Sequence, residues 1–129
     1  MSHSFSCACG EVKVEVNEGA ECVFSTICHC TRCREVTGTA ALWANGFSSD
    51  HVQVTGDVIA YTHEVNIRTS CASCGSFMFE PVPSMGITML PANRMSHPTP
   101  PMAHVYVKSA VYPLPDGGVP RFEEMPPMG

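Results

Sequence analysis

The chain has 129 residues, 44% of them hydrophobic, which is the size of one ordinary domain with a core of its own. Seven Lys and Arg stand against twelve Asp and Glu, giving a net charge of −5 without any block of like charge, so neither nucleic acid nor a membrane surface is expected as a partner. No apolar run reaches the roughly 18 residues that a membrane-spanning helix needs, and no secretory signal follows Met1. We therefore expect a single domain over 1–129 in the reducing cytoplasm, where clustered cysteines more often hold a metal than form disulfides.

Short strands dominate the pattern along the chain. In EVKVEV, Val12, Val14 and Val16 alternate with charged residues, which is the two-residue period of a half-buried strand. Further strands are predicted at HVQVT (51–55), VIAYTH (58–63), NIRTS (66–70), SFMFE (76–80), GITML (86–90) and HVYVKS (104–109). TRCREV, from Thr31 to Val36, predicts a short helix that ends before Gly38. The sequence predicts an all-β domain with at most one short helix.

Two cysteine pairs, each followed by glycine, predict a closed metal site. The four thiols belong to Cys7, Cys9, Cys71 and Cys74. A turn that ends in glycine aims two thiolates at one point, because Gly10 and Gly75 can adopt the positive φ that turns backbone amides toward sulfur. Four sulfurs form the tetrahedral donor set of a structural zinc site. The alternative is two pairs of free thiols on turns.

Three further cysteines lie within ICHCTRC, spaced CxCxxC. They are Cys28, Cys30 and Cys33, and three ligands leave zinc a fourth position for water or substrate. The start of the short helix, with Arg32 or Arg34, favours thiolate over thiol. His29 is a candidate fourth ligand, but strand alternation predicts that it points away from the metal and is hydrogen-bonded elsewhere. Cys22 is expected to be a small buried hydrophobe.

These segments together resemble a known family. SCACGEVKVEV, CHCTRCREVTG, CASCGSFMFE, HVYVKS and DGGVPRFEEMP are similar to the ordered signature of the glutathione-dependent formaldehyde-activating family, which includes centromere protein V, over Ser6 to Pro126. The resemblance implies a β-tent fold of several coiled antiparallel sheets with zinc knuckles and two zinc ions per chain. It places a structural zinc on Cys7, Cys9, Cys71 and Cys74 and a catalytic zinc on Cys28, Cys30 and Cys33.

The resemblance also implies a reaction. The family joins formaldehyde to glutathione as S-hydroxymethylglutathione, so glutathione and an aldehyde are the expected small-molecule partners, and the activity is that of a carbon–sulfur lyase or synthase. Zinc with an open position can take the thiol as thiolate or polarise the aldehyde oxygen. Arg34 or Arg68 could bind the carboxylates of glutathione. His63, His97 and His104 are candidates for proton transfer, although a strand histidine satisfied by a neighbour is the simpler expectation for His104.

Several points stay open on the sequence alone. The same fold without turnover would be a glutathione-binding, zinc-binding or partner-binding module. Ser70, MLPAN at 89–93 and Tyr112 depart from the family pattern around the expected pocket. Methionines at 85, 89, 95 and 102 are expected to fill the core rather than to line a pocket. A homodimer is left open, and 1–4 and 127–129 are expected to be flexible.

Overall fold

The chain folds into two β-sheets and one α-helix in a computed structural model that describes residues 3–114 and 118–126. In chain order the elements are β1 His3–Ser6, β2 Lys13–Val16, β3 Phe24–Cys28, α1 Thr31–Thr37, β4 Leu42–Ser48, β5 Val52–Thr55, β6 Val58–His63, β7 Asn66–Cys71, β8 Phe77–Val82, β9 Ile87–Pro91 and β10 Ala103–Val105. Short 3₁₀ turns cover Ser49–His51, Pro83–Met85, Ala92–Arg94 and Val107–Ser109. The mostly β architecture with one short helix is confirmed.

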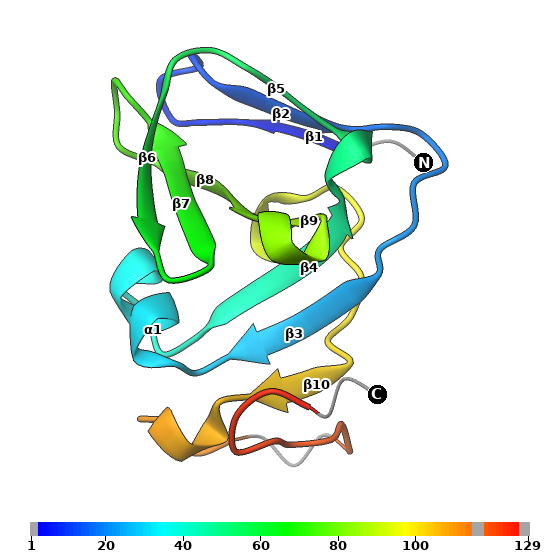
Figure 1. The fold of residues 1–129 in the computed structure, drawn as a ribbon, viewed down its shortest axis with the longest axis vertical. Coiled ribbons are helices and arrows are strands. Elements are labelled where there is room, and N and C mark those ends of the chain that lie inside the picture. The colour runs from blue at the N-terminus through cyan, green and yellow to red at the C-terminus, as the bar shows by residue number, and fades with distance from the viewer. Residues whose placement is uncertain (1–2, 115–117, 127–129) are drawn as a thin grey trace.

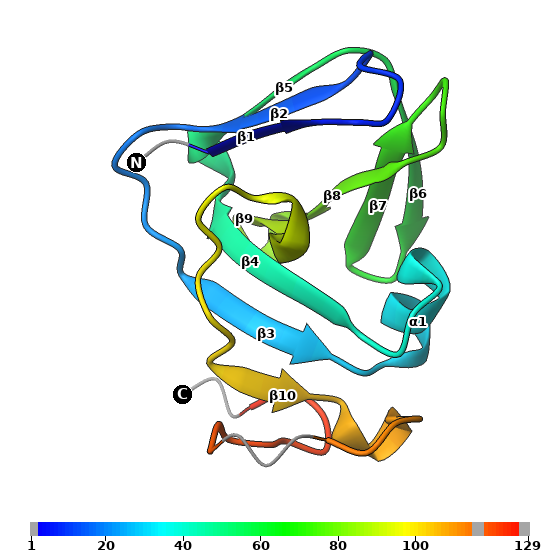
Figure 2. The same ribbon diagram turned by 180° about the vertical axis from the view of Figure 1, so that it is seen from behind.

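The two sheets differ in size and in position. The smaller has the order β1-β2-β5, and the larger has the order β10-β3-β4-β9-β8-β7-β6. The small sheet lies across the top of the molecule in Figures 1 and 2, while the large sheet coils below it so that the β6–β7 hairpin descends to α1. Neighbouring strands are antiparallel except β10 and β3, which pair in parallel. This last pair departs from the expected all-antiparallel arrangement.

The main core lies between the two sheets. Val12, Val14 and Val16 are buried there, as their alternation in sequence predicts. Phe47 from β4 and Leu90 from β9 cover them from the large sheet. In β4 and β9 the alternate residues therefore point away from this core, which leaves the opposite face of the large sheet free to line a separate site.

Helix α1 begins and ends at residues that favour helix termini. Cys30 is the N-cap, and its Sγ accepts a hydrogen bond from the Cys33 N–H at 3.3 Å. Gly38 follows the last turn with a φ of 67°, and its N–H donates to the Arg34 carbonyl at 2.8 Å. The predicted helix is confirmed, and it extends one residue further, to Thr37.

Three strands and one strand end were not expected. β1 is only four residues long, with Phe5 as its one buried apolar residue, and β3 and β4 show no clear alternation because they contain the buried polar Ser25 and Asn45 and Gly46. The strand predicted at 104–109 is wrong in its second half: it ends at Val105 because Tyr106 adopts a left-handed φ of 56°, and a 3₁₀ turn follows.

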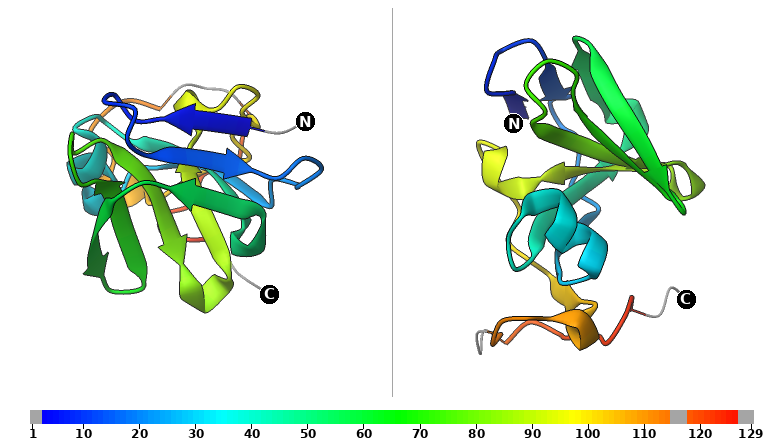
Figure 3. Two further views of the ribbon diagram at one scale, coloured as in Figure 1. Left: turned by 90° about the horizontal axis from the view of Figure 1, so that it is seen from above. Right: turned by 90° about the vertical axis from the view of Figure 1, so that its left-hand side faces the viewer.

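The remaining features of the fold are the length of its helices and the position of the chain ends. Among the described residues, no helix is long and apolar enough to cross a membrane. His3 and Ser4 belong to β1, whereas 1–2 and the tail at 127–129, both expected to be flexible, lie outside the described residues. Seen from the side in the right-hand view of Figure 3, β10, the edge strand of the large sheet, and the segment that follows it lie below α1. This end of the molecule also holds the pocket described below.

Candidate metal centres and the adjoining pocket

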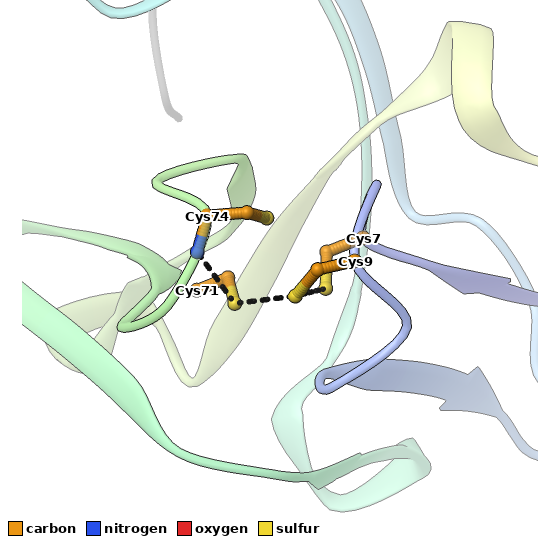
Figure 4. Close-up of side chains that lie close together, drawn as sticks. All are labelled: Cys7, Cys9, Cys71 and Cys74. Atoms are coloured by element: carbon orange, nitrogen blue, oxygen red, sulfur yellow. Dashed lines mark hydrogen bonds between the residues drawn. The ribbon is translucent and has the colours of Figure 1, made fainter.

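The four cysteines of the two glycine-terminated pairs meet between the sheets. The sulfurs of Cys7, Cys9, Cys71 and Cys74 all lie within 4.8 Å of one another. Cys9 Sγ is 3.6 Å from Cys7 Sγ and 3.7 Å from Cys71 Sγ, and Figure 4 shows the two pairs facing each other from separate turns. Cys7 and Cys71 are buried, whereas Cys9 and Cys74 are exposed. We call this group the four-cysteine cluster.

Glycine geometry builds both turns as the sequence predicts. Gly10 has a φ of 82° and Gly75 a φ of 78°, and each N–H donates to the carbonyl of the cysteine that begins its turn, at 3.0 and 2.9 Å. The Val12 N–H donates to Cys7 Sγ at 3.2 Å, and the Cys74 N–H donates to Cys71 Sγ at 3.4 Å. Amides that point at sulfur favour the thiolate, which is the form that binds metal.

The second group comes from one continuous segment. Cys28 ends β3, Cys30 caps α1 and Cys33 lies in the first turn of the helix, and their sulfurs also lie within 4.8 Å of one another. The helix start is a weak positive pole, and the Cys33 N–H already points at Cys30 Sγ. We call this group the three-cysteine cluster.

Charge in the three-cysteine cluster is shared unequally. Hydrogen bonds from the Cys28 and Cys33 thiols lower the pKa of Cys30 to about 2. The Cys30 side chain raises the pKa of Cys28 to about 12, and Cys28 and Cys30 raise the pKa of Cys33 as well. One thiolate is therefore favoured, and three at this spacing repel each other unless a cation lies among them.

Both donor sets fit a thiophilic metal. All eight cysteines are free thiols, and seven of them fall into the two clusters. Thiolate sulfur is a soft ligand that favours zinc over magnesium or calcium. Four sulfurs can close a tetrahedral site, whereas three leave one position for another ligand. The clusters are thus compatible with zinc, with a different coordination at each.

The remaining cysteine and the neighbouring histidine stay out of the clusters. Cys22 is half-buried against the main core, and its Sγ donates to the Phe24 carbonyl at 3.3 Å. His29 is buried and turned toward β10, where its Nε2 lies 3.0 Å from Nδ1 of the buried His104. His29 was expected to be hydrogen-bonded away from the metal, and His104 to be satisfied by a neighbour. The two histidines are each other's partner. His97, by contrast, lies near His3, with ring centroids 6.1 Å apart.

A large pocket opens beside the three-cysteine cluster. Its volume is about 650 Å³, and Cys28, Cys30 and Cys33 all line it, whereas no member of the four-cysteine cluster does. Its walls come from α1, the inner strands of the large sheet, the β6–β7 turn and the residues after β10. A pocket of this size can enclose most of a small organic ligand.

Charged groups border this pocket on several sides. Arg32, Arg68 and Lys108 supply positive charge, and Glu64 and Glu80 supply negative charge. Arg32 Nε donates to Nε2 of the pocket-lining His63 at 2.7 Å, and Arg32 Nη1 donates to Glu35 at 2.9 Å. Of the two arginines considered from sequence, Arg68 lines the pocket. Arg34 is not among the lining residues and instead donates to Thr31 at 3.2 Å.

Glu80 is the pocket residue that the sequence reading missed. It is 8% exposed, and its carboxylate accepts a hydrogen bond from Asn66 Nδ2 at 2.9 Å. Burial raises the pKa of Glu80, while Asn66 and the charge of Arg68 oppose this rise and the charge of Cys30 adds to it. A single glutamate in the strand FMFEPV matches no motif, so its sequence does not predict a function. Its position on the buried side of the strand, where charged residues are rare, is the one sequence feature that could have identified it.

The methionines divide between two environments. Met95 is buried in the main core, which is the use expected for all four. Met85 and Met89 line the pocket instead, as does Met125, and Met102 is 48% exposed outside it. The expectation of core filling is therefore wrong for Met85 and Met89, which line the pocket, and for the exposed Met102, and it holds for Met95.

Comparisons with known proteins agree with this arrangement. The profile of a family described as glutathione-dependent formaldehyde-activating enzyme matches residues 2–109. Among solved structures, a crystal structure of a Rhodobacter sphaeroides protein from a structural genomics programme is similar, with a TM-score of 0.60 and 18% identity, over 92% of this chain and 98% of that one. At this identity the likeness concerns the fold alone. A search of curated proteins finds no match.

Proposed function

This chain belongs to the glutathione-dependent formaldehyde-activating enzyme family, and from that premise we propose that it is a carbon–sulfur lyase or synthase that joins an aldehyde to glutathione reversibly, as in S-hydroxymethylglutathione. The observation that carries this proposal is the different surroundings of the two cysteine clusters. The three-cysteine cluster forms part of a pocket wall, whereas the four-cysteine cluster does not. An incomplete donor set beside a ligand-sized space is typical of a catalytic metal, and a complete set away from it is typical of a structural metal.

Each cluster then has its own role. Cys7, Cys9, Cys71 and Cys74 hold a structural zinc, and Cys28, Cys30 and Cys33 hold a catalytic zinc, so the chain carries two zinc ions. When bound, the catalytic zinc supplies an acceptor for a thiolate or an aldehyde oxygen. The free thiols suit a reducing compartment, and we assign the protein to the cytoplasm.

Pocket residues supply binding and proton transfer. Glutathione carries two carboxylates, to which Arg68, Arg32 and Lys108 at the pocket can donate hydrogen bonds. In the forward direction the thiol loses its proton, its sulfur bonds to the carbonyl carbon, and the carbonyl oxygen gains a proton to become a hydroxyl. Glu80 is the buried carboxyl in the pocket, and we assign it to this proton transfer. The reverse steps split the adduct without net oxidation or reduction.

Exchange spectroscopy tests the reaction directly. Two-dimensional exchange NMR with ¹³C-formaldehyde and glutathione measures how fast the adduct interconverts with its components. We expect the zinc-loaded protein to speed this exchange and C30S to remove most of the gain, because serine can still cap α1 but is a poor zinc ligand. C22S is the matched control, since Cys22 lies outside both clusters, and it should keep the wild-type rate. Glutathione binding with an exchange rate equal to that of buffer would instead identify a carrier.

A further inference from the structure

The wall of the pocket that leads away from the three-cysteine cluster is mostly apolar, with Thr26 of β3 as a polar residue within it and Glu80 of β8 beside Met89 at its edge. It is one face of the inner strands of the large sheet, where alternate residues of β3, β4 and β9 and the last residue of β8 point into the pocket. The residues that form it are Phe24, Leu42, Ala44, Val82, Ile87 and Met89. We call this set the apolar wall.

Strand register places the apolar wall at a fixed position relative to the cysteines. Cys28 pairs with Leu42 at one end of β3, and Phe24 pairs with Gly46 at the other. Four residue steps along a strand correspond to about 13 Å. The wall therefore begins beside the reactive end of the pocket and extends away from it by the length of a short hydrocarbon chain.

Gly46 has a specific part in this construction. It stands between Phe24 on β3 and Met89 on β9. A Cβ atom added at Gly46 would lie 2.8 Å from Met89 Sδ and 3.2 Å from Phe24 Cβ. The missing side chain lets the two large side chains close the far part of the wall. Glycine inside a strand otherwise lacks a side chain to pack and weakens the strand.

The apolar wall does not match the chemistry of formaldehyde and glutathione alone. Formaldehyde has no hydrocarbon beyond its reacting carbon, and glutathione is a peptide with two carboxylates. The groups suited to those carboxylates, Arg32, Arg68 and Lys108, come from α1, the hairpin and the segment after β10 rather than from the wall. An apolar surface that borders a reactive site favours a ligand with an apolar part directly attached to the reacting atom.

We propose that the electrophile of this site is an aliphatic aldehyde of several carbons, whose chain lies against the apolar wall while the glutathione carboxylates contact the cationic side chains of the pocket. This inference rests on the proposed function and specifies its substrate class. The step is the same addition: the glutathione sulfur bonds to the carbonyl carbon, the carbonyl π pair becomes the oxygen lone pair, and that oxygen takes the proton lost by the thiol. The product is a thiohemiacetal that carries the alkyl chain.

Calorimetry with stable analogues tests the chain-length preference without turnover. S-methyl-, S-butyl- and S-hexylglutathione place an alkyl chain on sulfur where the thiohemiacetal carries its own, and they lack only its hydroxyl. With zinc-loaded protein we expect affinity to rise with each methylene by up to about fourfold, the effect of burying one methylene. S-hexylglutathione should bind at least tenfold more tightly than S-methylglutathione.

Substitutions in the wall separate this effect from general hydrophobic binding. M89Q replaces a half-buried wall residue with a polar one of similar length, and we expect it to flatten the rise of affinity with chain length. M102Q makes the same change at an exposed methionine outside the pocket and should keep the wild-type rise.

The outcomes distinguish the two proposals. Equal affinities for glutathione and all three analogues would overturn the alkyl-chain inference and leave the formaldehyde reaction in place. A rise with chain length that M89Q and M102Q alter equally would also overturn it, because the chain would then bind elsewhere. No binding of glutathione or of any analogue would overturn both proposals together.

Discussion

At the scale of single residues, Cys30 links helix geometry to the chemistry of the site. Its sulfur accepts the Cys33 N–H at the start of α1 and also lies within 4.8 Å of the other two sulfurs of its cluster. The pKa of Cys30 is lowered chiefly by the thiols of Cys28 and Cys33. The cap, the helix start and the cluster therefore favour a thiolate at the same position.

Glu80 is the residue whose ionisation should be visible in stability. Burial raises its pKa above the ordinary carboxyl value of 4.5, so the folded chain holds this proton more tightly than the unfolded chain. The stabilisation is fully present below pH 4.5 and is lost as the pH rises through the folded-state pKa. We expect E80Q to remove this loss, because glutamine can still accept the Asn66 hydrogen bond but carries no charge.

The measurement is the difference in melting temperature between wild type and E80Q as a function of pH. The melting temperature of E80Q relative to wild type should increase as the pH rises above 4.5. Above the folded-state pKa of Glu80 the difference in melting temperature should stay constant. A difference that is independent of pH, or one that shrinks over this window, would contradict the assigned ionisation. Taking the difference removes the pH dependence of the groups that do not interact with Glu80, which both chains share.

At the scale of elements, the turns carry most of the sequence information. Gly10 and Gly75 identify the two knuckles, and Gly38 identifies the end of α1; each has the positive φ that its position in the pattern predicts. The valine alternation that ends in Val16 and the run from Val58 to His63 likewise predict real strands. Local signals of this kind depend only on residues close together in the chain.

The inner strands could not be predicted in the same way. β3 and β4 lie inside the large sheet, and residues on both faces of β4 are buried, so its sequence shows no simple two-residue period. Ser25 can be buried without loss of hydrogen bonding, because it donates to the Thr99 carbonyl at 2.8 Å and accepts from Asn45 at 2.9 Å. These partners are far away in the chain and cannot be predicted from the sequence around Ser25. The apolar wall and Glu80 depend on the pairing of the inner strands, so neither was predicted, whereas the cysteines beside them were.

Two glycine substitutions test whether the connection between β5 and β6 packs closely against the Glu11 backbone. Gly56, between β5 and β6, has a φ of 101°, and a Cβ there would lie 2.0 Å from the Glu11 carbonyl oxygen. Gly86 has a φ of 66° with nothing within 4 Å of the same atom. We expect G86A to lose about 1–2 kcal/mol of unfolding free energy from the left-handed backbone. G56A should lose about 1–3 kcal/mol more, because backbone atoms must move.

Urea denaturation of both variants measures these losses. Gly86 serves as the matched control, since it shares the positive φ without the close approach. Equal losses for the two variants would show that the contact between the 55–58 connection and the Glu11 carbonyl can relax freely. That result would contradict the close approach of Gly56 to the Glu11 carbonyl.

At the scale of the whole molecule, the proposed function gives the four-cysteine cluster a structural role and the three-cysteine cluster a catalytic one. The four-cysteine cluster joins the turn after β1 in the small sheet to the turn after β7 in the large one, as Figures 1 and 4 show. A metal there connects positions 7 and 74, which are far apart in the chain, and binding energy at such a site stabilises the fold. The three-cysteine cluster comes from one short segment and borders the pocket, so a metal bound there would be within reach of a ligand in the pocket.

Zinc stoichiometry by native mass spectrometry tests this division most directly. Protein purified with zinc should carry two ions per chain, and C30S should carry one while remaining folded. C22S should still carry two, since that thiol belongs to neither cluster. A wild-type chain with one zinc, or a C30S chain that keeps both, would contradict an open zinc site at Cys28, Cys30 and Cys33.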